Sequence, residues 1–129
     1  MLDLISRYIV LISRYIVFPL KYSISGLQFA IRDRAFRFEI ILGTIFIPIL
    51  LMIFKNHLLY FLLVWMSYCG ILTSELLNCA VEKTIDYISP EKHFLAKQAK
   101  DIASAAVFLM IINFFIVLIF SISLVLKST

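Results

Sequence analysis

Charged residues are scarce in this chain of 129 residues: aspartate, glutamate, lysine and arginine together make up 16%, whereas 63% of the residues are hydrophobic. A soluble domain is usually about half apolar and about a quarter charged. A chain of this length has too little interior to bury so much apolar surface. The composition therefore excludes an ordinary soluble domain and a disordered chain, and it indicates one small membrane domain.

Cysteine, glycine and proline are also rare, with two, three and three copies. Cys69 and Cys79 lie in a segment that reads as one helix, so about 15 Å of helix axis separates them. That distance is too long for a disulfide bond, and we expect both thiols to be free. The composition therefore excludes a scaffold held by disulfides, and the shortage of turn residues leaves little room for long loops.

Three long runs without charge indicate three membrane-spanning helices. The runs are Ile40 to Phe54, Leu58 to Ser74 and Ile102 to Leu126. The first run is short, but Phe38 and a snorkelling Arg37 can extend it. We expect spans over about residues 38–56, 58–82 and 102–126, with a tight turn at 55–57 between the first two.

Basic residues flank these runs unevenly. Ten lie before the first run or between the second and third: Arg7, Arg14, Lys21, Arg32, Arg34, Arg37, Lys83, Lys92, Lys97 and Lys100. The other two, Lys55 and Lys127, lie at the opposite ends of the spans. We therefore expect the N-terminus and the 83–100 loop in the cytoplasm, and no nucleic-acid partner is needed to explain the net charge of +4.

The N-terminal region contains a repeat of seven residues, in which Ile5–Leu11 is followed by Ile12–Phe18. The repeat places Arg7, Arg14 and Lys21 on one stripe of a helix whose other faces are apolar. We expect an amphipathic helix on the cytoplasmic surface of the membrane, although a chance duplication without a separate role is the alternative. The expected organisation is thus an interfacial region, residues 1–37, and a transmembrane domain, residues 38–129.

Polar residues form one face of the second span. Glu75, Asn78, Glu82 and Asp86 follow one another at helical spacing, so all four point from an arc of about 80°. Glu75 follows an uncharged run at the cytoplasmic edge of the hydrocarbon, where an unpaired carboxylate is costly and suggests function. The alternative, a solvated helix end, suits Asp86 better than Glu75. Three acids on one stripe repel each other, and a divalent cation with oxygen ligands would relieve that repulsion.

Two further polar clusters lie on the same predicted side of the membrane. They are Lys97, Lys100, Asp101 and Ser104 at the start of the third span, and Arg32, Asp33, Arg34, Arg37 and Glu39 before the first. Acids and cations together suit a magnesium-bound polyphosphate, whose charge the basic side chains would counter. The sequence has no glycine-rich phosphate loop and no kinase His-Arg-Asp motif, so a nucleotide site here would be non-standard.

The segment from Glu75 to Asp86, Glu-Leu-Leu-Asn-Cys-Ala-Val-Glu-Lys-Thr-Ile-Asp, resembles the signature of the small prokaryotic diacylglycerol kinases. The resemblance continues in residues 96–107 and 33–39. It implies an all-α membrane protein with three transmembrane helices and an N-terminal amphipathic surface helix. It also implies a homotrimer in the bacterial inner membrane, with active sites shared between copies.

The same resemblance implies a kinase that uses Mg²⁺ and ATP to phosphorylate the hydroxyl of diacylglycerol, a membrane lipid, giving phosphatidic acid. In this comparison Glu75 would be the general base that takes the hydroxyl proton. Asn78 would help to orient that region of the helix.

The remaining site residues are also implied by the resemblance. Glu82 and Asp33 would hold the metal ion, and Asp33 stands where the family usually has glutamate. Asp86 would contact the nucleotide, Lys100 would neutralise phosphate charge, and Asp101 would support the site.

Two alternative functions stay open. The Gram-positive branch of the same family resembles undecaprenol kinase, which phosphorylates a polyprenol, although residues 35–39 and 104–106 look more like the diacylglycerol branch. The second alternative is a small oligomeric transporter that uses Glu75 as a proton-coupled site. Such a transporter needs its acid near the middle of the membrane, whereas this acid face lies at one edge beside lysines.

Overall fold

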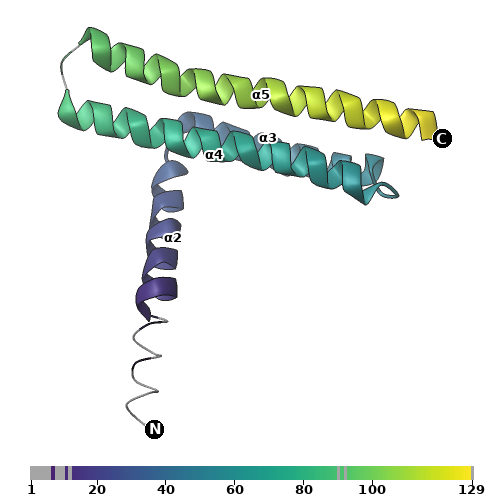
Figure 1. The fold of residues 1–129 in the computed structure, drawn as a ribbon, viewed down its shortest axis with the longest axis horizontal. Coiled ribbons are helices and arrows are strands. Elements are labelled where there is room, and N and C mark those ends of the chain that lie inside the picture. Colours follow the sequence, from purple (N-terminus) through teal and green to yellow (C-terminus); the bar gives the residue numbers. More distant parts are fainter. Residues whose placement is uncertain (1–6, 8–10, 12, 90, 92, 129) are drawn as a thin grey trace. The chain divides into compact units, whose positions relative to one another are not determined.

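A computed structural model describes the chain except residues 1–6, 8–10, 12, 90, 92 and 129. Its elements are η1 (Ser13–Val17), α2 (Phe18–Ala30), α3 (Arg34–Ile53), α4 (Leu58–Ile88) and α5 (Phe94–Ser128), shown in Figure 1. The predicted all-α class is confirmed. The chain divides into two compact units, residues 1–33 and residues 34–129.

The first unit contains one turn of π-helix, η1, followed by the α-helix α2. Pro19 lies in the first turn of α2, where a missing backbone N–H costs no hydrogen bond. Lys21 and several apolar side chains of α2, among them Leu20 and Ile24, are exposed. Part of the repeat over residues 5–18 lies outside the described residues, so the amphipathic surface helix stays a prediction.

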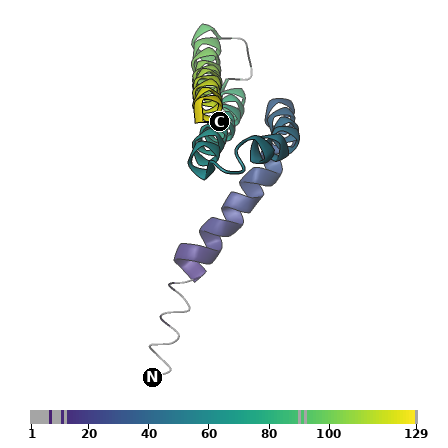
Figure 2. The same cartoon turned by 90° about the vertical axis from the view of Figure 1, so that its right-hand side faces the viewer.

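The second unit consists of three helices, α3, α4 and α5, each long and apolar enough to cross a membrane. α5 packs along α4, and α3 packs on α4 as well (Figures 1 and 2). The turn predicted at residues 55–57 is present at 54–56. The prediction of three membrane-spanning helices is therefore confirmed in number and order.

All three helices extend beyond the uncharged runs of the sequence. α3 begins at Arg34, α4 continues to Ile88, and α5 begins at Phe94. A helix that leaves the hydrocarbon keeps its backbone hydrogen bonds by continuing, so charged residues can follow without ending it. The acid face and the basic start of α5 are consequently both helical.

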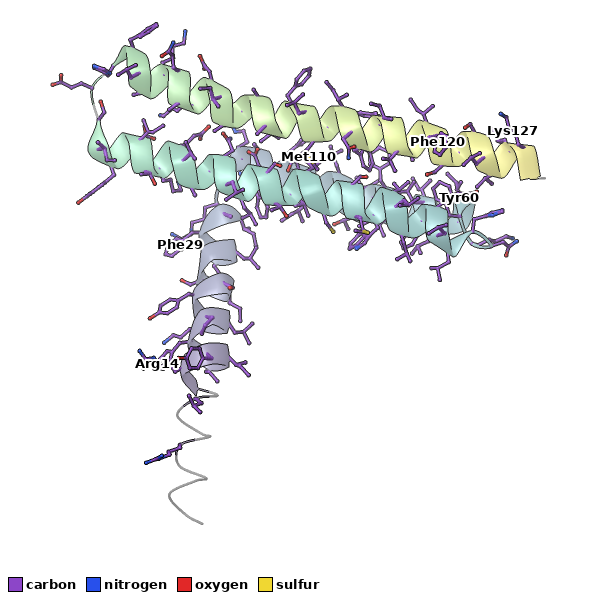
Figure 3. All side chains as sticks on the ribbon, in the orientation of Figure 1. Arg14, Phe29, Tyr60, Met110, Phe120 and Lys127 are labelled. Carbon is purple, nitrogen blue, oxygen red and sulfur yellow. The ribbon has the colours of Figure 1, made fainter. Side chains whose placement is uncertain are left out.

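The two ends of the second unit differ in what they contain. The turn end carries the α3–α4 turn and the C-terminus of α5, with Tyr60 and Lys127 nearby (Figure 3). The connection end carries the α4–α5 connection, residues 89–93. The turn end has an apolar cluster of Leu50, Phe54 and Val64, against which side chains of α4 and α5 pack.

Small residues let the helices approach closely. A methyl group on Gly43 of α3 would overlap the Tyr68 hydroxyl of α4, and one on Gly70 of α4 would overlap the end of Met110 of α5. The Tyr68 hydroxyl donates a hydrogen bond of 2.9 Å to the backbone carbonyl oxygen of Glu39. In a membrane, where lipid tails are as apolar as the helices, such close packing holds helices together.

Candidate active site

The predicted acid face lies on one uninterrupted helix, α4, so its four polar residues share a side of that helix. Burial decreases along the face. Glu75 and Asn78 are 4% and 7% exposed, Glu82 is half-buried, and Asp86 is exposed. The face therefore leads from the interior of the second unit to its connection end.

Glu75 has a second carboxyl group close to it, that of Glu39 on α3. The two carboxylates are close enough for their charges to repel each other. Glu39 Oε2 is buried, and within the described part of the chain it has no hydrogen-bond partner. The sequence shows Glu39 only as one of a charged cluster, and the packing of α3 on α4 brings it to the site.

Asn78 connects Glu75 to the rest of the acid face. Its Nδ2 donates a hydrogen bond of 3.3 Å to Glu82 Oε1, one helical turn further along. Its Oδ1 is buried and accepts no hydrogen bond from the residues that the structure describes. A buried acceptor of this kind usually indicates a water molecule, ion or ligand that completes the site.

Lys100 joins the start of α5 to the acid face. Its Nζ donates to Asp86 Oδ1 at 2.5 Å, forming an ion pair between α4 and α5. Asp101, the next residue, is turned about 100° away around the helix axis and is exposed. The structure thus brings Lys100 to the acid face, and among the described contacts it brings no group of that face to Asp101.

The predicted metal pair, Asp33 and Glu82, lies on two different units. Asp33 ends the first unit, where its backbone N–H donates to the Ala30 carbonyl oxygen at 2.8 Å. The described residues contain no group of three or more acid, histidine or cysteine side chains suited to a metal ion. Mg²⁺ needs fewer protein ligands, because it keeps several waters and takes one or two carboxylates with substrate phosphates. The Glu82 carboxylate and Asn78 Oδ1 are donors of that kind.

A cavity of about 570 Å³ opens at the connection end. Its polar lining consists of Asp86, Ser89, Glu91, His93, Lys97 and Lys100. Local hydrogen bonds shape this connection: Ser89 Oγ donates to the Glu91 carbonyl oxygen, and the Leu95 N–H donates to His93 Nδ1, both at 3.2 Å. Glu91 and His93 are not among the site residues predicted from the sequence, because single residues in a connection carry no periodic signal.

A second cavity, of about 290 Å³, lies between α3, α4 and α5. Its lining is apolar, with Phe46, Trp65 and Phe114 among it, and within the described residues Glu39 supplies the one charged side chain. The glutamate beside Glu75 therefore also borders an apolar space inside the bundle. This arrangement suits an apolar molecule that carries a polar group.

Known proteins resemble the chain over most of the second unit. A family model described as prokaryotic diacylglycerol kinase matches residues 21–122. A diacylglycerol kinase of Haemophilus influenzae is 38% identical over 77 residues, which are 60% of this chain and 64% of the relative. A diacylglycerol kinase of Helicobacter pylori is 38% identical over 76 residues, 59% of each chain. An undecaprenol kinase of Bacillus subtilis is 44% identical over 46 residues, 36% of this chain and 37% of the relative.

The chain covers 64% and 59% of the length of these two diacylglycerol kinases. The family match is wider, since residues 21–122 include α3, α4 and every residue predicted for the site. With its three candidate spans, the chain is a multi-pass membrane protein. Because the family model matches residues 21–122, the chain belongs to the prokaryotic diacylglycerol kinase family.

Proposed function

We propose that this chain is a lipid kinase that transfers the γ-phosphoryl group of ATP to the hydroxyl of diacylglycerol, giving phosphatidic acid. The observation that carries the proposal is the acid face of α4, which runs from the buried Glu75 to the Asp86–Lys100 ion pair beside a polar cavity. Similarity to proteins named diacylglycerol kinase supports it.

Glu75 acts as the general base in this proposal. Its carboxylate takes the proton of the lipid hydroxyl while the hydroxyl oxygen forms a bond to the γ-phosphorus. The bond from the γ-phosphorus to the bridging oxygen breaks, ADP leaves, and the proton passes from Glu75 to water. Phosphoryl transfer depends mainly on positioning, and a base buried at the edge of the hydrocarbon lies where a lipid hydroxyl can reach it.

Mg²⁺ fits the oxygen donors of this face. Glu82 would hold the ion, and Asn78 would keep the Glu82 side chain in place through its hydrogen bond. The unpartnered Asn78 Oδ1 is a further oxygen donor on the same side of α4. A bound Mg²⁺ would supply positive charge that offsets the charge of the phosphates.

The nucleotide would lie in the cavity at the connection end. Lys100 would neutralise phosphate charge, and Asp86 would contact the nucleotide and hold the Lys100 ammonium group in place. Lys97 adds a second cation to the same lining. The volume of about 570 Å³ is within the usual range of small-molecule sites.

We also propose a homotrimer in the bacterial inner membrane, with the N-terminus in the cytoplasm. The excess of basic residues before α3 and around the α4–α5 connection supports this orientation. Asp101 is exposed beside Lys100, so it would support a site that is completed by a neighbouring copy.

Undecaprenol is the second candidate acceptor. It is favoured by the similarity to a Bacillus subtilis protein named undecaprenol kinase. Both acceptors present one hydroxyl at the membrane surface, so the same base and nucleotide site serve either one.

The test is phosphate transfer from labelled ATP by the purified full chain in lipid vesicles. Diacylglycerol and undecaprenol are offered separately, with and without Mg²⁺, to the wild type and to Glu82→Gln. We expect faster labelling of diacylglycerol, dependence on Mg²⁺, and a higher Mg²⁺ requirement in Glu82→Gln. Faster labelling of undecaprenol would select the second candidate, and no transfer to either lipid would contradict the kinase. Equal rates with and without Mg²⁺ would contradict the metal assignment.

A further inference from the structure

The apolar cavity between α3, α4 and α5 is elongated and is charged at one end. Its lining on α3 runs from Phe38 to Leu50, about 18 Å along the helix axis. Glu39 lies at the start of this stretch, and Leu50 belongs to the apolar cluster of the turn end. Phe46 and Phe115 in the lining are 51% and 53% exposed, so a molecule can enter from the surrounding lipid. The proposed reaction uses neither this cavity nor Glu39.

Aromatic rings form one wall of the cavity. They make a continuous chain of ring pairs through α4 and α5: Phe61, Trp65, Tyr68 and Phe114. In that order their ring centroids lie 6.5, 5.9 and 6.4 Å apart. The face of an aromatic ring is electron-rich, so it attracts a cation. The Tyr68 hydroxyl also donates to the Glu39 backbone carbonyl oxygen at 2.9 Å, which fixes the glutamate beside this wall.

The Glu39 carboxylate lacks a partner at the charged end of the cavity. Its Oε2 atom is buried and accepts no hydrogen bond from the described residues. The carboxylate also lies close enough to Glu75 for the two negative charges to repel each other. Lipid tails can fill the apolar part of the cavity, but they offer Oε2 neither a hydrogen-bond donor nor a positive charge. A bound cation that donates hydrogen bonds would supply both.

We propose that this cavity binds a single-chain amphiphile whose head is a protonated amine. The ammonium group donates to Glu39 Oε2, and the apolar chain lies along the aromatic wall toward the turn end. A neutral alcohol would supply a hydrogen bond without the charge, and the carboxylate would repel an anionic head. The volume of about 290 Å³ is just below the usual range of drug-sized sites, which suits one chain of medium length.

Trp65 is the single tryptophan of the chain and lines the cavity, so its fluorescence reports an occupant. The probes are decylamine and decanol, each with a bromine atom at the chain end that quenches tryptophan fluorescence on contact. The purified full chain is titrated with each probe at neutral pH, where the amine is protonated, in phosphatidylcholine vesicles that carry no net charge. Each probe is compared between wild type and variants, because its partitioning into the lipid is then the same.

The head group is tested with Glu39→Gln, which removes the charge at nearly constant size. Glu91→Gln is the matched control, because Glu91 lines the other cavity. We expect Glu39→Gln to raise the bromodecylamine concentration for half-quenching about tenfold. Glu39→Asp and Glu91→Gln should stay within about threefold of the wild type, and so should bromodecanol with every protein.

Two results of this titration would overturn the proposal. Equal half-quenching by bromodecylamine in the wild type and in Glu39→Gln would mean that bromine reaches Trp65 from the lipid alone. An equal shift for both probes in Glu39→Gln would mean that the head group needs no positive charge. Circular dichroism checks that the helical content of each variant is unchanged.

The position of the chain is tested with Ile111→Phe, because Ile111 lines the cavity and the larger ring would fill part of it. Ile112→Phe is the matched control, since Ile112 is 40% exposed and lies outside the lining. We expect Ile111→Phe to weaken quenching by bromodecylamine about threefold or more, and Ile112→Phe to match the wild type. Unchanged quenching in Ile111→Phe would place the chain outside the cavity and overturn the proposal. Neither titration uses ATP or transfer of phosphate, so this site and the proposed kinase can fail separately.

Discussion

The turn end and the connection end of the second unit share α4 and α5, yet they are held together differently. At the turn end, Leu50, Phe54 and Val64 form a buried apolar cluster. At the connection end, an ion pair links Asp86 to Lys100 beside an open cavity. Apolar packing contributes stability and has no reactive groups, whereas charged groups at an open end contribute little stability and can bind a ligand. The comparison indicates that stability and chemistry lie at opposite ends of the same helices.

Glu75 lies between the two ends and has a property of each. It is buried like the apolar cluster and charged like the connection end. Substitutions in these three places therefore test whether stability and chemistry are separate.

The largest expected effect is on the rate of transfer, in Glu75→Gln. Loss of the base should lower kcat for lipid phosphorylation by about a hundredfold to ten-thousandfold, while the helical content is unchanged. Thr73→Val is the control on the same helix, because the Thr73 hydroxyl donates to the Cys69 carbonyl oxygen and is exposed. A kcat within about twofold of the wild type would remove Glu75 from the role of base.

The next effect is on stability, in Phe54→Ala at the turn end. Phe54 is 2% exposed, and its truncation should lower the free energy of unfolding by about 3–5 kcal/mol. Unfolding in mixed detergent micelles measures this change, and Met52→Ala, in an exposed neighbour, should change it by less than about 0.5 kcal/mol. We expect kcat per folded molecule to stay within about twofold. A fall in kcat as large as in Glu75→Gln would show that packing at the turn end also controls the chemistry.

A smaller effect is expected between the ends, in Gly43→Ala. The added methyl group would overlap the Tyr68 hydroxyl, which bonds the Glu39 backbone, so α3 should shift on α4 at a cost of about 1–3 kcal/mol. In this variant the free energy of unfolding and the rate of lipid phosphorylation should both fall, because Glu39 lies beside Glu75. Gly26→Ala is the control, since nothing lies within 4 Å of the added group. If Gly43→Ala changed neither the free energy of unfolding nor the rate of phosphorylation, this would argue against close packing of α3 on α4.

The smallest effect is expected from the charge pair at the connection end. A double-mutant cycle of Asp86→Asn and Lys100→Met should give a coupling energy below about 1 kcal/mol in the free energy of unfolding, because the pair is partly solvated. Lys100→Met should nevertheless raise KM for ATP. A coupling energy above about 2 kcal/mol would mean that the ion pair holds α4 and α5 together and that the connection end also contributes stability.

Local sequence determined the helices and the acid face. The three apolar helices, the free thiols of Cys69 and Cys79, and the alignment of Glu75 with Asp86 all depend on residues close together in the chain. The period of the helix then decides which side chains share a face. The roles of Glu75, Asn78, Glu82, Asp86, Lys100, Asp101 and Asp33 come from the family resemblance and await the experiments.

Only the tertiary structure decided which faces of the helices meet. Apolar residues surround α5 on all sides, so its sequence does not indicate the side that packs on α4. The pairing of Lys100 with Asp86, the approach of Glu39 to Glu75 and the fit of Tyr68 over Gly43 all depend on how each helix is rotated about its axis. That rotation follows from close packing between residues distant in sequence, because lipid tails do not favour one apolar face over another.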